Sequence, residues 1–260
     1  MIEGGWWIGV FFLFGSIWGS FANVVIVRLP LNKSVVTPRS HCPQCKSVIP
    51  WYLNIPILSW ILLHGRCQKC QKPIPFRYPL VEFTMGFFFA AIYTRFGFSF
   101  STLEYFIFTF GLVTSSFIDL DHMILPDRFT LSGIVLGLFG AFLNPERYFL
   151  DALVGALLGG GLLLAVAYFY MLVRKVEGMG GGDIKLLSWI GAVCGIQSIL
   201  FVLIVSSLLG LVFGLAYMLK SKQGMQTGIP FGPYLSLAAL IYLLWGQDVW
   251  MTLLFPPIST

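Results

Sequence analysis

Long apolar runs fill most of this chain and leave few residues that could cover a soluble surface. Of the 260 residues, 57% are hydrophobic and 10% are charged, and the mean hydropathy is +0.85. A soluble domain of this size could not cover such a composition with polar side chains. The sequence therefore predicts an all-α polytopic membrane protein.

The apolar runs divide into eight stretches, most of them close to the roughly 20 residues that a spanning helix needs. With generous boundaries they are residues 6–27, 80–98, 102–118, 129–143, 149–173, 184–195, 196–219 and 229–247. Stretches 129–143 and 184–195 are short, so seven spans are also possible. We expect about eight transmembrane helices and three domains. These are a first transmembrane helix over 1–27, a loop over 28–79 and a transmembrane core over 80–260.

Basic residues gather between the first two predicted spans and indicate which side of the membrane this segment faces. It carries eight Lys or Arg residues and no acidic residue before Glu82, and such loops stay in the cytoplasm. We therefore expect the amino terminus outside and the loop inside. This topology puts Asp119 and Asp183 at the same cytoplasmic depth. Together with attraction to anionic lipid it accounts for the net charge of +5 without a nucleic-acid partner.

Four cysteines define the loop over 28–79. Two C-x2-C pairs, Cys42 with Cys45 and Cys67 with Cys70, are 21 residues apart, and each continues as C-x2-C-x3-I-P. The repeat predicts two zinc-knuckle hairpins that offer four thiolates to one structural Zn2+. Metal binding can supply on the order of 10 kcal/mol of folding free energy to a loop with few apolar residues. Disulfides, thiol redox chemistry or an iron centre would use the same residues, although a reducing cytoplasm disfavours disulfides.

Two aspartates lie where apolar segments meet charged loops: Asp119 in SFIDLDHMILPD and Asp183 in GMGGGDIK. An ionisable residue at a membrane boundary is costly and usually functional. One carboxylate can deprotonate water while a second, protonated one polarises a peptide carbonyl, so the pair suggests an aspartyl hydrolase. Alternatively, Asp183 could cap a helix. Asp119, Asp121 and Asp127 could be ordinary loop acids or ligands of a divalent cation.

Four motifs together resemble the bacterial type IV prepilin peptidases, which are GxGD-type intramembrane aspartyl proteases. They are D-x6-P-D from Asp119 to Asp127, the G-x-G-D that ends at Asp183, the doubled cysteine motif, and PFGPYL from Pro230 to Leu235. The resemblance covers essentially the whole chain. It implies that Asp119 and Asp183 are the catalytic pair. Asp121 and Asp127 are then outside it, with Asp127 a cap or ion-pair partner and Lys185 an orienting charge near the site.

The resemblance also implies a reaction. Prepilin peptidases remove the basic leader of type IV prepilins and type II secretion pseudopilins at the cytoplasmic face of the bacterial inner membrane. Many members then methylate the new amino terminus with S-adenosylmethionine, and the cysteine loop is typical of these two-function forms. The implied cofactors are therefore zinc and S-adenosylmethionine, and the implied partners are prepilins and membrane lipid. No G-x-G-x-x-G fingerprint locates the methyl donor; Arg66, Arg77 and Glu82 are candidates, equally suited to anchoring at lipid headgroups.

Two other classes of function share some of these features. A zinc-bearing transporter would use membrane carboxylates as an ion pathway, but it predicts internal repeats, and none is found outside the cysteine loop. A non-enzymatic secretion assembly factor would use the loop only for docking, which leaves both aspartates without a role. The sequence sets no oligomeric state.

Overall fold

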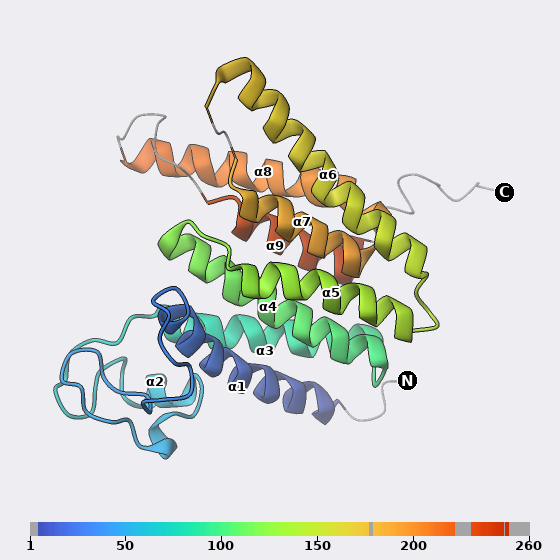
Figure 1. Cartoon of the computed structure of the whole chain (residues 1–260). Coiled ribbons are helices and arrows are strands. Elements are labelled where there is room, and N and C mark those ends of the chain that lie inside the picture. Colours follow the sequence, from blue (N-terminus) through green and yellow to red (C-terminus); the bar gives the residue numbers. More distant parts are fainter. Residues whose placement is uncertain (1–4, 177–178, 222–229, 247, 250–260) are drawn as a thin grey trace. The chain divides into compact units, whose positions relative to one another are not determined.

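Helices make up nearly all the regular structure in the residues that the computed structural model describes, which are 5–176, 179–221, 230–246 and 248–249. The long helices are α1 (Trp6–Arg28), α3 (Arg77–Phe96), α4 (Phe100–His122), α5 (Asp127–Leu143), α6 (Phe149–Arg174), α7 (Gly181–Cys194), α8 (Ile196–Ser221) and α9 (Gly232–Ile241), which continues as the π-helical turn η2 (Tyr242–Gly246) (Figure 1). The loop holds η1 (Trp51–Leu53) and α2 (Leu58–Leu62). The predicted all-α class is confirmed.

Each apolar stretch identified in the sequence corresponds to one of these long helices. Within the described ranges, four helices are long and apolar enough to cross a membrane by length and composition: α1, α4, α6 and the first 21 residues of α8. A shorter apolar helix covers Gly232–Gly246. The chain therefore has the helices of a membrane protein, and the number of spans stays a prediction.

Gly195 separates α7 from α8. It is the one residue between these two apolar helices. Its φ of 78° lies in the region that favours glycine. The amide of Ile196, where α8 begins, donates a hydrogen bond of 3.2 Å to Asp151 Oδ1. A side chain at position 195 would collide with the same carboxylate. These features end one helix and start the next, so residues 184–219 form two helices rather than one.

The chain divides into two compact units, Met1–Thr114 and Ser115–Thr260, with the boundary inside α4. In unit 1, α1 and α3 pack through small residues. A Cβ on Gly19 would lie 2.6 Å from the Cα of Glu82, and one on Gly86 would lie 2.5 Å from Ser16 Oγ. Membrane helices commonly associate through such small residues, which let their backbones approach closely.

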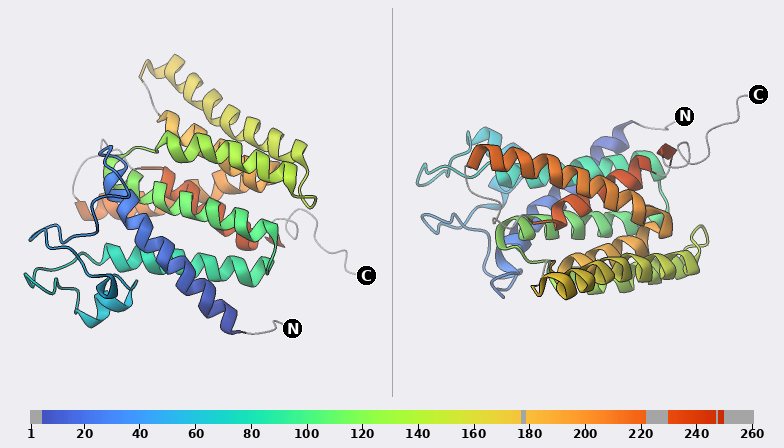
Figure 2. Two further views of the ribbon diagram at one scale, coloured as in Figure 1. Left: turned by 60° about the horizontal axis from the view of Figure 1, so that its bottom comes forward. Right: turned by 90° about the horizontal axis from the view of Figure 1, so that it is seen from above.

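In unit 2, α7 packs against both α5 and α6 (Figure 2). Glycines allow the closest approaches. Gly155 of α6 lies against the backbone of Gly191 of α7, and a Cβ on Gly159 would lie 2.5 Å from the carbonyl oxygen of Leu187. These two contacts define an antiparallel register between α6 and α7. The register determines which part of α6 lies beside the start of α7.

Candidate functional site

Asp119 lies near the C-terminal end of α4 and is only 5% exposed. Its Oδ2 accepts a hydrogen bond of 3.1 Å from the backbone N–H of Gly232, the first residue of α9. A buried carboxylate is costly unless it is paired or hydrogen-bonded. The start of α9 therefore supplies the partner that this carboxylate needs.

Asp183 is the third residue of α7, is half-buried, and is close enough to Asp119 for the two carboxyl groups to interact electrostatically. Leu125 lies against Gly182, which precedes Asp183, and against Gly232, which is bonded to Asp119. A Cβ on Gly182 would lie 2.8 Å from Leu125 Cβ, and one on Gly232 would lie 3.0 Å from Leu125 Cδ2. The fold thus brings the two aspartates together from α4 and α7. No side-chain hydrogen bond caps α7, so Asp183 is not a hydrogen-bonding cap, although it lies in the first turn, where a carboxylate meets the positive end of the helix dipole.

The other acidic residues near this site have different surroundings. Asp121 is exposed on α4. Asp127 begins α5 and forms an ion pair of 2.6 Å with Lys185 of α7, which confirms the predicted role of ion-pair partner. Both side chains are more than one-third exposed, so the pair contributes at most about 1 kcal/mol. Its main effect is to join the start of α5 to the start of α7, two residues from Asp183.

Both α6 and α8 extend past the level of the two aspartates. The register between α6 and α7 puts Leu163 level with Asp183, and the eleven residues of Leu164–Arg174 continue α6 by roughly 16 Å at about 1.5 Å per residue. On α8, Gly210 lies against the first turn of α9, and Leu211–Ser221 continue beyond it. Figure 1 shows both overhanging ends. Two long apolar helices, α6 and α8, therefore continue past the two aspartates by about three turns each.

In unit 1, the two halves of the cysteine repeat fold alike. His41 bridges to Val48 in the first half and Arg66 to Pro73 in the second. The residue four positions after the first cysteine of each half has a positive φ, 54° at Lys46 and 57° at Gln71. The motif shared by the two halves has produced similar turns. The predicted pair of hairpins is present.

The four cysteines Cys42, Cys45, Cys67 and Cys70 come together, with all their Sγ atoms within 4.8 Å of one another. The Sγ atoms of Cys42 and Cys70 are 3.9 Å apart, as are those of Cys45 and Cys67. Four thiolates around Zn2+ at about 2.3 Å would be about 3.8 Å apart, whereas a disulfide would need about 2.05 Å. The cysteines are free. The cluster fits a tetrahedral metal site.

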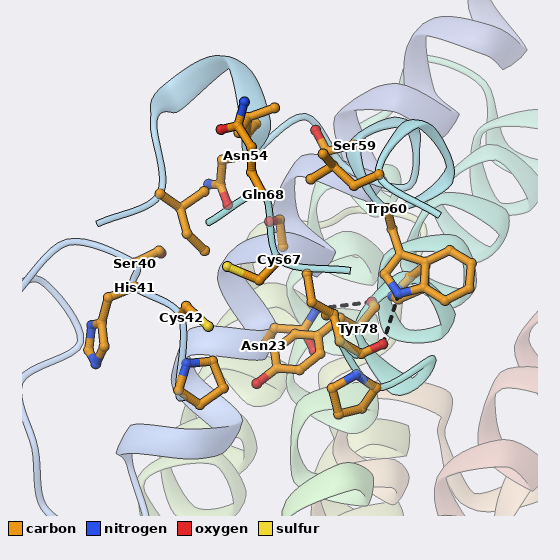
Figure 3. A pocket seen from close by; sticks show the side chains of 18 of the residues that line it. Asn23, Ser40, His41, Cys42, Asn54, Ser59, Trp60, Cys67, Gln68 and Tyr78 are labelled. Carbon is orange, nitrogen blue, oxygen red and sulfur yellow. Dashed lines mark hydrogen bonds between the residues drawn. The ribbon is translucent and has the colours of Figure 1, made fainter. Parts of the chain in front are cut away.

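Beside this cluster lies a pocket of about 300 Å³ between the loop, α1 and α3 (Figure 3). Its lining combines apolar side chains with polar groups held by hydrogen bonds. Asn23 Nδ2 donates to the carbonyl oxygen of Tyr78 over 3.1 Å, and Trp60 Nε1 donates to that of Ile74 over 3.1 Å. Glu82 is the carboxylate among the lining residues, and its Oε2 accepts the Ile57 amide over 2.7 Å. Pockets at the small end of the ligand-binding range have this volume.

The three residues considered for the methyl donor differ in their relation to this pocket. Glu82 lines it, whereas Arg66 and Arg77 are not among its lining residues. Cys42 and Cys67 also line it, so the cysteine cluster and the pocket share a wall (Figure 3).

Two family models match the chain. The Bacterial Peptidase A24 N-terminal domain matches residues 13–96, and the Type IV leader peptidase family matches residues 106–215. Curated relatives called prepilin leader peptidase/N-methyltransferase were found in Aeromonas hydrophila, Stutzerimonas stutzeri and Pseudomonas aeruginosa. The Aeromonas hydrophila protein is 38% identical over 92% of this chain and 90% of its own length. The Stutzerimonas stutzeri protein is 37% identical over 90% and 89%, and the Pseudomonas aeruginosa protein is 36% identical over 93% and 91%. This chain belongs to the prepilin leader peptidase/N-methyltransferase family. The resemblance carried by the motifs is thereby confirmed. No solved structure matches the chain.

The match to the prepilin peptidase family includes both aspartates but ends before the PFGPYL segment. Sequence reasoning used that segment only as a marker of the family and gave Leu125 no part in the site. The structure adds Gly232 and Leu125 to the surroundings of the aspartates. A glycine directly before a proline at a helix start hints at a close backbone contact, but an isolated leucine in a loop gives no such signal.

Proposed function

We propose that this protein cleaves the basic leader from type IV prepilins or type II secretion pseudopilins with Asp119 and Asp183, and then methylates the new amino terminus. The observation that carries the cleavage reaction is the meeting of buried Asp119 with Asp183 at the ends of α4 and α7. Two carboxyl groups that share one proton can serve as base and acid in the same step. The names of the relatives include both activities.

The cleavage chemistry follows from such a pair. The ionised carboxyl takes a proton from water as the water oxygen bonds to the peptide carbonyl carbon, and the protonated carboxyl gives its proton to the carbonyl oxygen. Breakdown of the tetrahedral species moves a proton to the leaving nitrogen and regenerates the pair. The active site supplies this chemistry from its own two side chains.

The proposed orientation follows the distribution of Lys and Arg, with the amino terminus outside and the loop over 28–79 and both aspartates facing the cytoplasm of a bacterial inner membrane. We propose three domains: a first transmembrane helix over 1–27, the cysteine loop over 28–79, and a transmembrane peptidase core over 80–260. A prepilin inserted with its basic leader inside brings the scissile bond to the cytoplasmic side. Asp119, Asp183 and the scissile bond would then lie at the same depth in the membrane.

The overhanging ends of α6 and α8 support lateral binding of the substrate. The side chains of Tyr168–Arg174 are all exposed, and most of this segment is apolar. An apolar pilin helix can lie beside it while its leader passes toward the cytoplasm. The binding energy of that helix would then position the scissile bond at Asp119 and Asp183.

For the metal, we propose that Cys42, Cys45, Cys67 and Cys70 hold one structural Zn2+. Four thiolates form a closed site with no position left for a reactant. The metal would therefore stabilise the loop and the pocket beside it rather than take part in hydrolysis.

For the methyl donor, we propose the pocket between the loop, α1 and α3. S-adenosylmethionine combines a flat aromatic base with a sulfonium cation and an amino-acid end that carries an ammonium and a carboxylate. The apolar lining with Trp60 suits the base, and the carboxylate of Glu82 suits a cation. When bound, the donor would supply an electrophilic methyl group to the freed amine.

The experiment that tests this function is incubation of the purified protein with a prepilin and S-adenosylmethionine, followed by measurement of the product mass. We expect loss of the leader and a gain of one methyl group. Leader removal without methylation would support the peptidase activity and contradict the methyltransferase activity. An unchanged prepilin would contradict both proposed activities.

A further inference from the structure

The segment PFGPYL at Pro230–Leu235 marked the family, but the chemistry above gives it no role. In the structure its Gly232 begins α9, and the N–H of this glycine donates to Oδ2 of Asp119. The bond is buried. Pro233 follows in the first turn of α9, where its missing N–H breaks no bond of the helix. The segment thus directs one backbone donor at one of the two aspartates.

Position 232 requires glycine because the backbone approaches Asp119 so closely. A Cβ there would lie 2.7 Å from Asp119 Oδ2 and 3.0 Å from Leu125 Cδ2. Neither neighbour has much room to move, since Asp119 is 5% exposed and Leu125 also packs against Gly182. Any larger residue would lengthen the hydrogen bond.

The two aspartates are therefore not equivalent. A hydrogen bond from an N–H favours the ionised form of the carboxylate that accepts it. Asp119 has this bond, whereas the carboxyl of Asp183 accepts no hydrogen bond from any residue in the described part of the chain. Asp183 does lie in the first turn of α7, but placement near a helix start is a weaker effect than a direct, buried hydrogen bond.

We propose that the Gly232 amide keeps Asp119 as the ionised member of the pair, so that Asp119 is the base and Asp183 the acid. This assignment rests on the two-aspartate cleavage proposed above. Gly232 is a positioning residue, since it acts through Asp119.

The assignment gives each proton a path. Asp119 takes the proton of the attacking water as the oxygen–carbon bond forms, and Asp183 gives its proton to the carbonyl oxygen. When the carbon–nitrogen bond breaks, Asp119 passes its proton to the leaving nitrogen, and a hydroxyl of the tetrahedral species returns one to Asp183. Both aspartates end as they began.

Other titratable and charged groups lie on the same helices. On the helices around Asp119 they are Asp121 and His122 of α4, Asp127 and Arg128 of α5, Asp183 and Lys185 of α7, and Tyr234 of α9. Lys185 is paired with Asp127, so its charge is largely compensated. Within the described residues, the Gly232 amide is the hydrogen-bond donor that distinguishes the two carboxyl groups.

The experiment measures the pH dependence of kcat for prepilin cleavage in variants of position 232. An amide-to-ester substitution at Gly232 removes the donor and adds no atom, and Gly232→Ala pushes Oδ2 away. Without the donor, a higher pH is needed to keep Asp119 ionised. We expect the acidic limb of the profile to move to higher pH by roughly half a unit or more, with kcat on that limb falling about threefold or more and KM little changed.

Two glycines of the Asp183 segment provide matched controls. A Cβ on Gly181 meets nothing within 4 Å, so Gly181→Ala should alter neither rate nor profile. A Cβ on Gly182 presses on Leu125 but not on Asp119, so Gly182→Ala should lower kcat and leave the acidic limb in place. Methylation of an already cleaved pilin reports that each variant is folded.

If the acidic limb of the pH profile does not move in the Gly232 ester variant, the assignment of Asp119 as the base is wrong. This holds even if kcat of the ester variant falls, because Gly182→Ala also lowers kcat without moving the limb. Failure of the underlying function has a different signature. In that case Asp119→Asn retains cleavage, whatever happens at position 232.

Discussion

Leu125 lies between the backbone beside Asp183 and the backbone that is bonded to Asp119. Its side chain contacts the positions of Gly182 and Gly232, each next to one aspartate or bonded to it. In the proposed mechanism, this packing would hold the two carboxyl groups within the narrow range of geometry that catalysis tolerates. The positions of the two carboxyl groups thus depend on a leucine that carries no chemistry itself.

At this scale we expect Asp119→Asn or Asp183→Asn to reduce cleavage by about 10³-fold or more, because an amide keeps the shape of the side chain but cannot exchange the proton. Asp121→Asn should retain substantial activity, since Asp121 is exposed. Cleavage assays on membranes with equal amounts of each protein measure this. Inactive Asp121→Asn together with active Asp119→Asn would mean that the wrong aspartate was assigned.

Sequence could identify the aspartates but not their surroundings. Asp119 and Asp183 stand out because charge is rare in apolar runs and because their motif spacings are specific. Gly232 acts through its backbone amide, and Leu125 acts through its volume. Neither property leaves a signature in the type of residue.

At the scale of helices, glycine contacts hold α6 and α7 together. A Cβ on Gly191 would collide with the backbone of Gly155, which cannot move as a side chain can. We expect Gly191→Ala to lower the free energy of unfolding by about 2 kcal/mol through this overlap. Thermal unfolding in detergent measures the loss. Gly161→Ala is the control on α6, since its Cβ meets nothing within 4 Å; equal loss in both variants would contradict the contact.

The loop leads to a prediction about metal. We expect about one zinc per purified chain, which is lost in the Cys42→Ser, Cys67→Ser double variant because one thiolate disappears from each hairpin. Metal analysis measures the loss. Chelators should inhibit methylation more than cleavage, since the donor pocket shares a wall with the cluster. Cleavage that returns in proportion to added zinc, with the fold intact, would contradict a metal-free aspartyl mechanism.

Sequence predicted the helices better than their arrangement. Apolar runs locate each helix, and yet α4 continues to His122, beyond the predicted apolar stretch 102–118. Backbone hydrogen bonds do not stop where polarity begins. The packing of α7 against both α5 and α6 depends on contacts between residues far apart in sequence, such as Gly133 against Trp189. A hydropathy pattern contains no information about such pairs.

At the scale of the molecule, the overhanging ends of α6 and α8 predict how substrate length affects the rate. We expect a soluble peptide that covers only the leader and the scissile glycine to be cleaved at least about 100-fold less efficiently than full prepilin, because it lacks the apolar helix that positions the bond. The comparison is between kcat/KM values in the same detergent or lipid. Equal values would exclude lateral docking of the pilin helix.

The clustering of the four cysteines also affects how unit 1 assembles. Helices α1 and α3 pair across the 48 residues from Leu29 to Phe76, and closing a loop costs entropy that grows with the logarithm of its length, by about 0.6 kcal/mol per doubling. In the proposed zinc-bound form, the metal would join the two hairpins and close the central part of this loop, so only the short segments on either side would remain to be ordered. Metal binding and the pairing of α1 with α3 would then favour each other thermodynamically, so the supply of metal would affect how readily these two helices pair.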